Sequence, residues 1–316
     1  MDITRTLIRK IKKKSKTGRE THVCVFSYKN NNNKCTTKEI DRIKKLNIPP
    51  IWKDVNISNS ELSYLQVTGK DEKDRTQYIY HPMWILLTNN EKYDRMGKFS
   101  KKIGFLEKQI KVDICSVDKI KQRIAIMFLI LKKTHIRVGN ECYAKDNNTY
   151  GLTTLKGKHL RIKGKCIIFN FVGKKGVKQN ISFSDSNCLI YFKNMGKITS
   201  ETELFPLITP IILKNYLADI MGSEFTCKDF RTYASNILFL KILCKYPIAN
   251  TKKEKKHNLK ETYDKVADKL GHTRAISKKS YVMGIIPEQY ELNPSQFSNK
   301  NPTELFRRFI TFSGRI

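Results

Sequence analysis

The sequence predicts an α+β chain in which a small β-rich domain precedes a larger, mostly helical domain that contains a short sheet. In the N-terminal part, Leu62–Thr68 and Thr76–Tyr80 carry alternating β-forming residues, and a polar turn begins between them at Gly69. This arrangement is typical of a β-hairpin. Further along the chain, apolar residues recur every three to four positions, which is typical of helices.

The length of 316 residues is enough for two domains, and a hydrophobic content of 40% can form a core in each. We place the β-rich domain at residues 1–90 and the mainly helical domain at residues 91–316. The polar stretch Asn89–Lys92 is the expected linker between them. An asparagine tract, Asn30–Asn33, is flanked by lysines and is expected at the tip of a loop.

Two segments of the second domain have a clear helical pattern. Ile120–Leu131 places its large apolar residues on one face, and Phe230–Leu238 does the same. Thr226 is the expected N-cap of the second helix, because Asp229 follows it by three residues. The basic run Lys252–Lys256 is expected to be a solvated loop.

The short sheet is predicted between these two helices. Cys166–Val172 and Val177–Phe183 are the expected strands, and Gly173–Gly176 is the turn that joins them.

The charge of the chain points to a polyanionic partner. Lysine and arginine number 61 against 29 acidic residues, which gives a net charge of +32 and a pI of about 9.8. Nucleic acid is the commonest partner of so basic a protein. No apolar run reaches the ~20 residues that a membrane span needs, and the polar N-terminus lacks the apolar core of a signal peptide. We therefore expect an intracellular protein that is neither secreted nor membrane-bound.

Several chemistries are not indicated by any motif. The eight cysteines are scattered without a Cys-x-x-Cys pair, which favours free thiols over disulfides or a zinc site. The chain has no Gly-x-x-x-x-Gly-Lys-Ser/Thr loop for ATP, and it lacks the dense acidic cluster of a two-metal nuclease.

Four segments of the second domain combine unusual polar residues with ordered surroundings. They are His135–Gly139, Phe171–Lys174, Lys228–Tyr233, and Leu270–His272 followed nine residues later by Tyr281. Each signal is weak alone, because an arginine after a helix or a lysine on a hairpin tip is usually a solvated charge. Their order is specific: Arg, Lys, Lys-x-x-Arg, Gly-His, Tyr.

This order resembles that of the type IB DNA topoisomerases of the poxvirus kind, which have relatives in other large DNA viruses and in bacteria. The resemblance covers most of the chain from about Ile48 onward. It rests on IPPIWKDV (48–55), GKDEKDRTQYIYHPMW (69–84), IRVGNECYAKDNNTYGLTTLKGKHL (136–160), FVGKKG (171–176), CKDFRTYASN (227–236) and LGHTRAISKKSY (270–281). The family fold that it implies is the catalytic domain shared with tyrosine recombinases, joined near Asn90 to an N-terminal domain so that the two form a C-shaped clamp on DNA.

The resemblance also implies the catalytic roles. Tyr281 would attack a DNA phosphodiester and form a 3′-phosphotyrosyl bond, while Arg137 and Arg231 hold the non-bridging phosphate oxygens. Guanidinium suits this task because it is planar, stays charged and binds bidentately. His272 would donate a further hydrogen bond to a phosphate oxygen. Lys174 would protonate the departing 5′-oxygen.

A second group of residues is implied to contact DNA. In the family, the N-terminal domain contacts the major groove, and a tyrosine after the Arg-x-Gly segment contacts DNA as well. Two more residues flank Arg231 and are expected to orient it or to contact backbone phosphate. The group comprises Gln77, Tyr78, Tyr80, Tyr143, Lys228 and Asn236.

Neither ATP nor a divalent metal is expected as a cofactor. The phosphotyrosyl bond keeps the energy that religation needs, and cationic side chains do the electrostatic work of a metal. The expected substrate is double-stranded DNA, whose positive and negative supercoils a monomeric enzyme would relax. The expected location is where viral or bacterial DNA lies, which is the virion or cytoplasm for a large DNA virus.

Two alternatives remain open. A tyrosine recombinase would share the catalytic residues, but recombinases usually have His-x-x-Arg where this chain has Lys228 and Arg231, and their N-terminal domain is helical. A non-catalytic DNA-binding protein on the same fold would fit the charge equally well.

Overall fold

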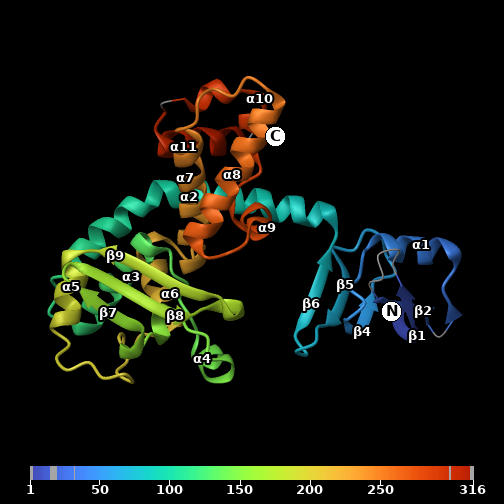
Figure 1. Cartoon of the computed structure of the whole chain (residues 1–316), viewed down its shortest axis with the longest axis horizontal. Coiled ribbons are helices and arrows are strands. Elements are labelled where there is room, and N and C mark those ends of the chain that lie inside the picture. The colour runs from blue at the N-terminus through green and yellow to red at the C-terminus, as the bar shows by residue number, and fades with distance from the viewer. Residues whose placement is uncertain (1–2, 15–19, 32, 299, 314–316) are drawn as a thin grey trace. The chain divides into compact units, whose positions relative to one another are not determined.

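The computed structural model describes residues 3–14, 20–31, 33–298 and 300–313 (Figure 1). The chain divides into two compact units, Met1–Glu91 and Lys92–Ile316. The first unit is built on an antiparallel sheet and the second is mostly helical with a small sheet. The predicted α+β class is thereby confirmed.

The sheet of the first unit has the strand order β3-β2-β1-β4-β5-β6. Helix α1 (Thr37–Lys45) begins at a capping box of Thr36 and Glu39 and buries Ile43 against the sheet. The other buried residues of this small core are Ile3, Cys35, Val55, Ile57 and Val67. The strands are β1 (Ile3–Lys14), β2 (Glu20–Asn30), β3 (Asn33–Lys34), β4 (Lys53–Ile57), β5 (Leu65–Lys70) and β6 (Thr76–Tyr80).

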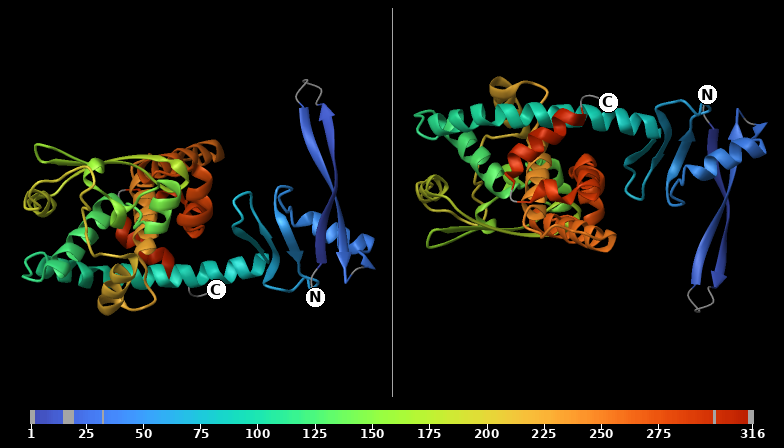
Figure 2. Two further views of the ribbon diagram at one scale, coloured as in Figure 1. Left: turned by 90° about the horizontal axis from the view of Figure 1, so that it is seen from below. Right: turned by 90° about the horizontal axis from the view of Figure 1, so that it is seen from above.

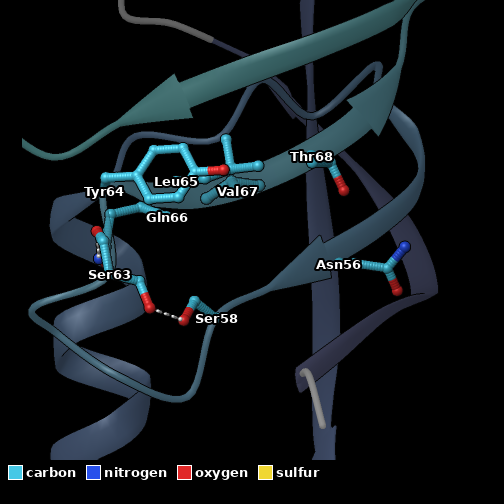
Figure 3. Close-up of a pocket in the computed structure, with 8 residues that line it drawn as sticks. All are labelled: Asn56, Ser58, Ser63, Tyr64, Leu65, Gln66, Val67 and Thr68. Carbon is cyan, nitrogen blue, oxygen red and sulfur yellow. Dashed lines mark hydrogen bonds between the residues drawn. The ribbon is translucent and has the colours of Figure 1, made fainter.

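The predicted hairpin is the β5–β6 pair, but its first strand begins at Leu65 rather than at Leu62. The reason is the buried side chain of Gln66, whose Nε2 donates hydrogen bonds to the carbonyl oxygens of Ser60, Glu61 and Ser63. These hydrogen bonds hold the preceding residues in a loop beside a small hollow (Figure 3). In the same loop the Ser58 hydroxyl donates a hydrogen bond to the Ser63 hydroxyl.

The asparagine tract lies at the expected chain reversal. β2 ends at Asn30, Asn31 follows in a turn with a positive φ of 48°, and β3 begins at Asn33. Asn32 lies outside the described residues.

The second unit packs its helices around one continuous core, in which large aromatic residues from distant segments meet. Phe99 contacts Phe225 and Phe230 edge to face, and Phe128 packs on Phe230. The helices are α2 (Pro82–Asp113, which starts in the first unit), α3 (Lys119–Thr134), α4 (Glu141–Asn147), α5 (Ser186–Lys193), α6 (Pro210–Met221), α7 (Cys227–Leu243), α8 (Lys252–Leu270), α9 (Arg274–Ile276), α10 (Ile285–Leu292) and α11 (Pro302–Ser313).

The small sheet has the order β7-β8-β9, with β7 at Leu160–Lys163, β8 at Cys166–Val172 and β9 at Lys178–Ser184. The hairpin of β8 and β9 is the predicted one. β7 was not expected, because three of its four residues are exposed and give no alternating apolar pattern.

Both predicted helices are present, as α3 and α7, and Thr226 forms the expected capping box with Asp229. Two other expectations are corrected. The expected linker, Asn89–Lys92, is helical because it lies inside α2. The run Lys252–Lys256 is the first turn of α8 and not a loop, since Thr251 caps this helix through Glu254.

All eight cysteines are free. No helix within the described ranges is both long and apolar enough to cross a membrane.

The buried Asp113 and the partly buried Tyr216 form a polar pair that joins α2 to α6. The Tyr216 hydroxyl donates a 2.6 Å hydrogen bond to the Asp113 carboxylate, which also accepts from Gln109, and the Tyr216 ring stacks on Phe128.

We expect Tyr216→Phe to lower the free energy of unfolding by about 1–3 kcal/mol, because it keeps the stacking but leaves a buried carboxylate short of a donor. Urea unfolding measures this, and an unchanged midpoint and slope would contradict it.

Candidate active site

The centre of the candidate site is Arg231, a buried arginine in the first turns of α7 that is 5% exposed. Its Nη2 donates to the carbonyl oxygen of Leu270, the last residue of α8, at 2.5 Å, and its Nη1 donates to that of His135, the C-cap of α3. Its Nε is buried and has no partner among the described residues. Arg231 therefore holds three segments together and keeps one donor free.

Arg137 reaches this centre because the chain turns sharply after α3. The carbonyl oxygens of Arg137 and Val138 accept from the backbone of Leu152 and Thr153 at 2.8 and 2.7 Å. Gly151 makes this approach possible: a Cβ there would lie 2.7 Å from the Arg137 carbonyl oxygen and 2.5 Å from the nitrogen of Gly139. No side chain fits between the two segments.

Tyr281 ends a turn of π-helix, Ser277–Tyr281, and is 3% exposed. Its ring centroid lies 5.6 Å from the Arg231 guanidinium and 4.9 Å from the ring centroid of His272. Burial raises the pKa of the phenol, but the charges of Arg231 and Arg137 outweigh burial and hold that pKa below its usual value. The phenol is thus easier to deprotonate than a free tyrosine.

His272 follows α8 by two residues and is held neutral. Burial, followed by the charge of Arg231, lowers the pKa of its imidazole to about 4. Both ring nitrogens are buried and have no hydrogen-bond partner in the part of the chain that the structure describes. A neutral imidazole has one N–H, so His272 can offer a donor to a ligand.

The backbone around Tyr281 is fixed by Asn236. The Asn236 side chain is fully buried, donates to the carbonyl oxygen of Tyr281 at 3.0 Å and accepts from the nitrogen of Met283 at 2.8 Å. Sequence reasoning predicted that Asn236 orients Arg231 or contacts backbone phosphate. Its amide instead bonds these backbone groups and the Thr232 carbonyl oxygen, so it contacts the backbone of Tyr281 and not the Arg231 side chain.

Two residues of α2 that sequence reasoning missed hold the same segment. Lys92 donates to the carbonyl oxygen of Ser280 at 2.7 Å, and the Tyr93 hydroxyl accepts from the nitrogen of Gly284 at 2.9 Å. Burial, and then the charge of Lys228, lowers the pKa of Lys92 to about 8. No local motif marks these residues, because their partners lie almost two hundred positions away.

Lys174 lies apart from the other four predicted catalytic residues. It lies in the turn between β8 and β9, is exposed, and among the described residues forms no hydrogen bond, ion pair or ring contact with any of them. The hairpin nevertheless touches the turn that leads to His272. A Cβ added to Gly271 would meet the Gln179 amide at 2.7 Å, and a Cβ added to Gly173 would meet the same side chain at 3.1 Å. Gln179 thus lies between the lysine turn and the histidine turn.

The predicted DNA-contacting residues of the first unit are on β6. Tyr78 and Tyr80 are 51% and 38% exposed, and their rings stack with centroids 6.0 Å apart. They therefore form a surface pair and not part of the sheet core. Gln77 points to the other face, where its Nε2 donates to the Asp71 carboxylate at 3.0 Å.

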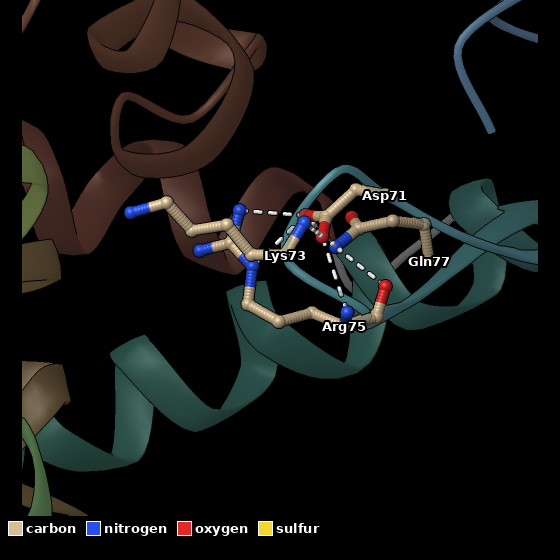
Figure 4. A network of polar contacts seen from close by, with 4 residues as sticks. All are labelled: Asp71, Lys73, Arg75 and Gln77. Carbon is tan, nitrogen blue, oxygen red and sulfur yellow. Dashed lines mark hydrogen bonds and ion pairs between the residues drawn. The ribbon is translucent and has the colours of Figure 1, made fainter. Parts of the chain in front are cut away.

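Asp71 organises this hairpin turn (Figure 4). It accepts from the Arg75 guanidinium at 2.6 and 2.9 Å and from the backbone nitrogen of Lys73 at 3.0 Å. The bonds from Arg75 lower the pKa of Asp71 to about 2, so the carboxylate stays ionised and holds Gln77 in place.

The last two predicted DNA contacts are on the second unit. Tyr143 lies on α4 and is 59% exposed, so it is not part of the helix core. Lys228 is exposed in the first turn of α7, three residues before Arg231. Among the described residues, no group of three His, Cys, Asp or Glu side chains is arranged to hold a metal ion.

Two protein families are similar to this chain. The catalytic core of eukaryotic DNA topoisomerase I matches residues 84–293, and the N-terminal domain of bacterial DNA topoisomerase IB matches residues 25–71. Both matches concern one class of enzyme, and the first spans more than half of the chain.

Individual proteins of large DNA viruses are also similar to this chain. DNA topoisomerase 1B of Acanthamoeba polyphaga mimivirus is 34% identical over 305 residues, which cover 90% of this chain and 91% of the viral protein. DNA topoisomerase 1B of vaccinia virus (strain Copenhagen) is 32% identical over 238 residues, covering 72% and 73% of the two chains. With a catalytic-core match of this extent and relatives of this similarity, the chain belongs to the type IB DNA topoisomerase family.

Proposed function

We propose that this protein relaxes positive and negative supercoils in duplex DNA by cutting one strand through a 3′-phosphotyrosyl intermediate and resealing it. The observation that carries the proposal is the buried phenol of Tyr281 beside the guanidinium of Arg231 and the neutral imidazole of His272. This set provides a nucleophile and fixed donors for the charge that develops at phosphorus.

In the cleavage step, the Tyr281 oxygen attacks phosphorus while the bond to the 5′-oxygen breaks. The lowered pKa of the phenol favours loss of its proton as the new P–O bond forms. The departing 5′-oxygen takes a proton, for which Lys174 is the proposed donor. Its exposed place on the hairpin tip fits a residue that meets the DNA strand.

The phosphate oxygens gain charge in the transition state. The free Nε–H of Arg231 and the unpartnered imidazole of His272 are donors that nothing else in the described structure uses. Arg137 supplies a second guanidinium. Removing one such donor from an enzyme typically costs ~10²–10³ in rate.

Religation reverses the same step. Because the phosphotyrosyl bond conserves the energy of the broken phosphodiester, we propose that no ATP is consumed. We also propose that the arginines and His272 provide the electrostatic stabilisation without a divalent ion.

We propose that the two units close around the duplex as a C-shaped clamp and that a single copy suffices. Tyr78 and Tyr80 would contact the major groove, while Tyr143 and Lys228 would contact DNA on the second unit. Gln77 lies on the opposite face of β6, where Asp71 holds it, and is not included in this contact. The exposure of both pairs, Tyr78 with Tyr80 and Tyr143 with Lys228, supports this assignment. Similarity to enzymes of large DNA viruses supports action at the site of viral DNA, in the virion or the cytoplasm.

The two alternatives are less well supported. The similar proteins are named as topoisomerases rather than recombinases, and the first unit is a sheet instead of a helical domain. A non-catalytic DNA-binding protein would not need a tyrosine with a lowered pKa in contact with two arginines.

The first test is Tyr281→Phe. We expect this variant to fold, to leave supercoiled plasmid unrelaxed and to form no covalent adduct, because the nucleophilic oxygen is gone. The assay uses EDTA and no nucleotide, conditions in which the unaltered protein should relax both supercoil signs. Tyr233→Phe is the matched control, since the Tyr233 ring packs on Phe99 and Phe306 inside the core. Relaxation by the Tyr281 variant, or strict dependence of the unaltered protein on Mg²⁺ or ATP, contradicts the proposal.

The second test is Gly151→Ala. A methyl group at this position must displace the backbone of Arg137, so we expect the single-turnover cleavage rate to fall by at least ~10-fold, in line with misplaced catalytic groups. Gly104→Ala is the control, because a Cβ there meets nothing within 4 Å and the position is inside α2. That change should raise stability by roughly 0.5–1 kcal/mol. Equal cleavage rates in the two variants would show that the contact between Gly151 and Gly139 does not position Arg137.

The third test concerns acid stability. The pKa of His272 is about 4 in the folded protein and 6.5 as a reference, so the unfolded chain binds more protons between these values. The contribution of neutral His272 to the free energy of unfolding is therefore fully present above about pH 6.5, and it is lost as pH falls toward 4. We expect His272→Asn to reduce this loss, measured by urea unfolding at a series of pH values. His257→Asn, at an exposed residue, is the control, and parallel pH profiles for both variants would refute the assignment.

A further inference from the structure

The first two strands of the chain form a ribbon that leaves the N-terminal sheet. β1 and β2 pair along their whole described length, from Ile3 with Asn30 to Lys14 with Glu20. β4 pairs with β1 only at Ile3 and Thr4, and β3 pairs with β2 only at Lys29 and Asn30. From Arg5 onward, within the described residues, the two strands therefore pair only with each other, as Figure 2 shows for the N-terminal unit.

The base of this β1–β2 ribbon is anchored. The Arg5 guanidinium donates to the carbonyl oxygens of Pro49 at 3.2 Å and Trp52 at 2.6 Å, and it lies 4.2 Å from the centroid of the Phe26 ring. These contacts fasten the ribbon to the loop that precedes β4. The base of the ribbon is thus fastened to its own unit.

Beyond its base the ribbon is strongly cationic. The sequence of β1 contains six lysine or arginine residues and no acidic residue. Arg9, Lys10 and Lys12 are exposed, and none forms an ion pair with a described residue. Because side chains of a strand alternate between its faces, Arg9 is on one face while Lys10 and Lys12 are on the other.

Apolar side chains are exposed among these cations. Ile8 is 60% exposed, Leu7 is 45% exposed and Val23 on β2 is 39% exposed. A two-stranded ribbon gains little stability by itself in water, so exposed apolar residues on such an element indicate a surface that is covered in use.

We propose that the β1–β2 ribbon is a second DNA-binding element, separate from the catalytic clamp, that inserts into the major groove of duplex DNA next to the clamp. The inference rests on the proposed function, because it assumes that duplex DNA is the substrate. The residues concerned lie before residue 25, where the match to the bacterial N-terminal domain begins, so that match does not account for them.

Duplex DNA fits the ribbon in width, length and chemistry. The major groove is about 12 Å wide and admits a two-stranded β-ribbon. At about 3.4 Å per residue, the eight positions from Leu7 to Lys14 extend ~27 Å, most of one turn of the duplex. Cations on both faces would meet the phosphates on both sides of the groove, and Ile8 and Leu7 suit thymine methyl groups.

The test uses the full chain with Tyr281→Phe, so that binding is measured without cleavage. We compare R9Q/K10Q/K12Q with two controls: the charge-conserving R9K/K10R/K12R, and K252Q/K253Q/K256Q, which removes the same charge from exposed positions of α8. We measure binding to a 40-base-pair fluorescent duplex from low to high salt. This length is about four helical turns, so that DNA extends to where the ribbon would bind. Circular dichroism confirms that each variant is folded.

We expect the ribbon variant to reduce the slope of log K against log salt by about 2 to 3, because each lost phosphate contact removes about 0.9. Hydroxyl-radical footprinting should show loss of protection at one end of the protected region. The charge-conserving variant should keep both the salt slope and the footprint of the unaltered ribbon. The α8 variant should keep the footprint. An unchanged footprint, or a slope change no larger than that of the α8 variant, overturns the proposal.

Two further outcomes separate this inference from its premise. If the ribbon variant alone loses binding to phosphatidylserine vesicles while its DNA slope is unchanged, the ribbon is a membrane contact and the inference fails. If the chain with Tyr281 intact forms no covalent adduct on a nicked duplex, the proposed function fails whatever the slopes show. A normal adduct with an unchanged slope rejects the ribbon assignment alone.

Discussion

The candidate active site depends on one buried arginine that is held by two helix ends. The last carbonyl groups of a helix have no partner within the helix and carry its negative partial charge. Arg231 meets this need at the ends of both α3 and α8, through His135 and Leu270. Burial alone disfavours its charge and lowers its pKa, and these carbonyl contacts offset part of that cost. Because Arg137 and His272 each follow one of these ends by two residues, the same contacts set the positions of both.

A second consequence is a concentration of positive charge around a phenol. Arg137 lowers the pKa of Arg231, Lys228 lowers that of Lys92, and both arginines lower that of Tyr281. The cations repel one another, so a site of this kind stores unfavourable energy that a bound phosphate relieves. Asn236 holds the carbonyl oxygen of Tyr281 and Lys92 holds that of Ser280, so the backbone at Tyr281 is fixed against this repulsion.

The parts of the structure that the sequence predicted are those with a local signal. α3 and α7 have helical periodicity, β8 and β9 flank a glycine turn, and the order of Arg137, Arg231, His272 and Tyr281 is specific. The contacts of Lys92, Tyr93 and Gln179 carry no local signal, since their partners come from remote segments. The start of α8 did have a signal, the Thr251 and Glu254 capping box, which the surrounding lysines obscured. β1 was missed because the bulge at Ile8 and consecutive lysines interrupt the alternation of a strand.

Lysines along the open edge of a strand have a second physical role, because they prevent another strand from pairing with that edge. That role accounts for one or two charges along the ribbon. It does not account for apolar residues beside them, since Ile8 and Leu7 would themselves promote association. Nor does it require an anchor such as Arg5, which fastens the base of the ribbon to the loop before β4 through Pro49 and Trp52. Charge, exposed apolar surface and a fixed base occur together where an element must meet a large anionic surface, and the substrate of this family is one.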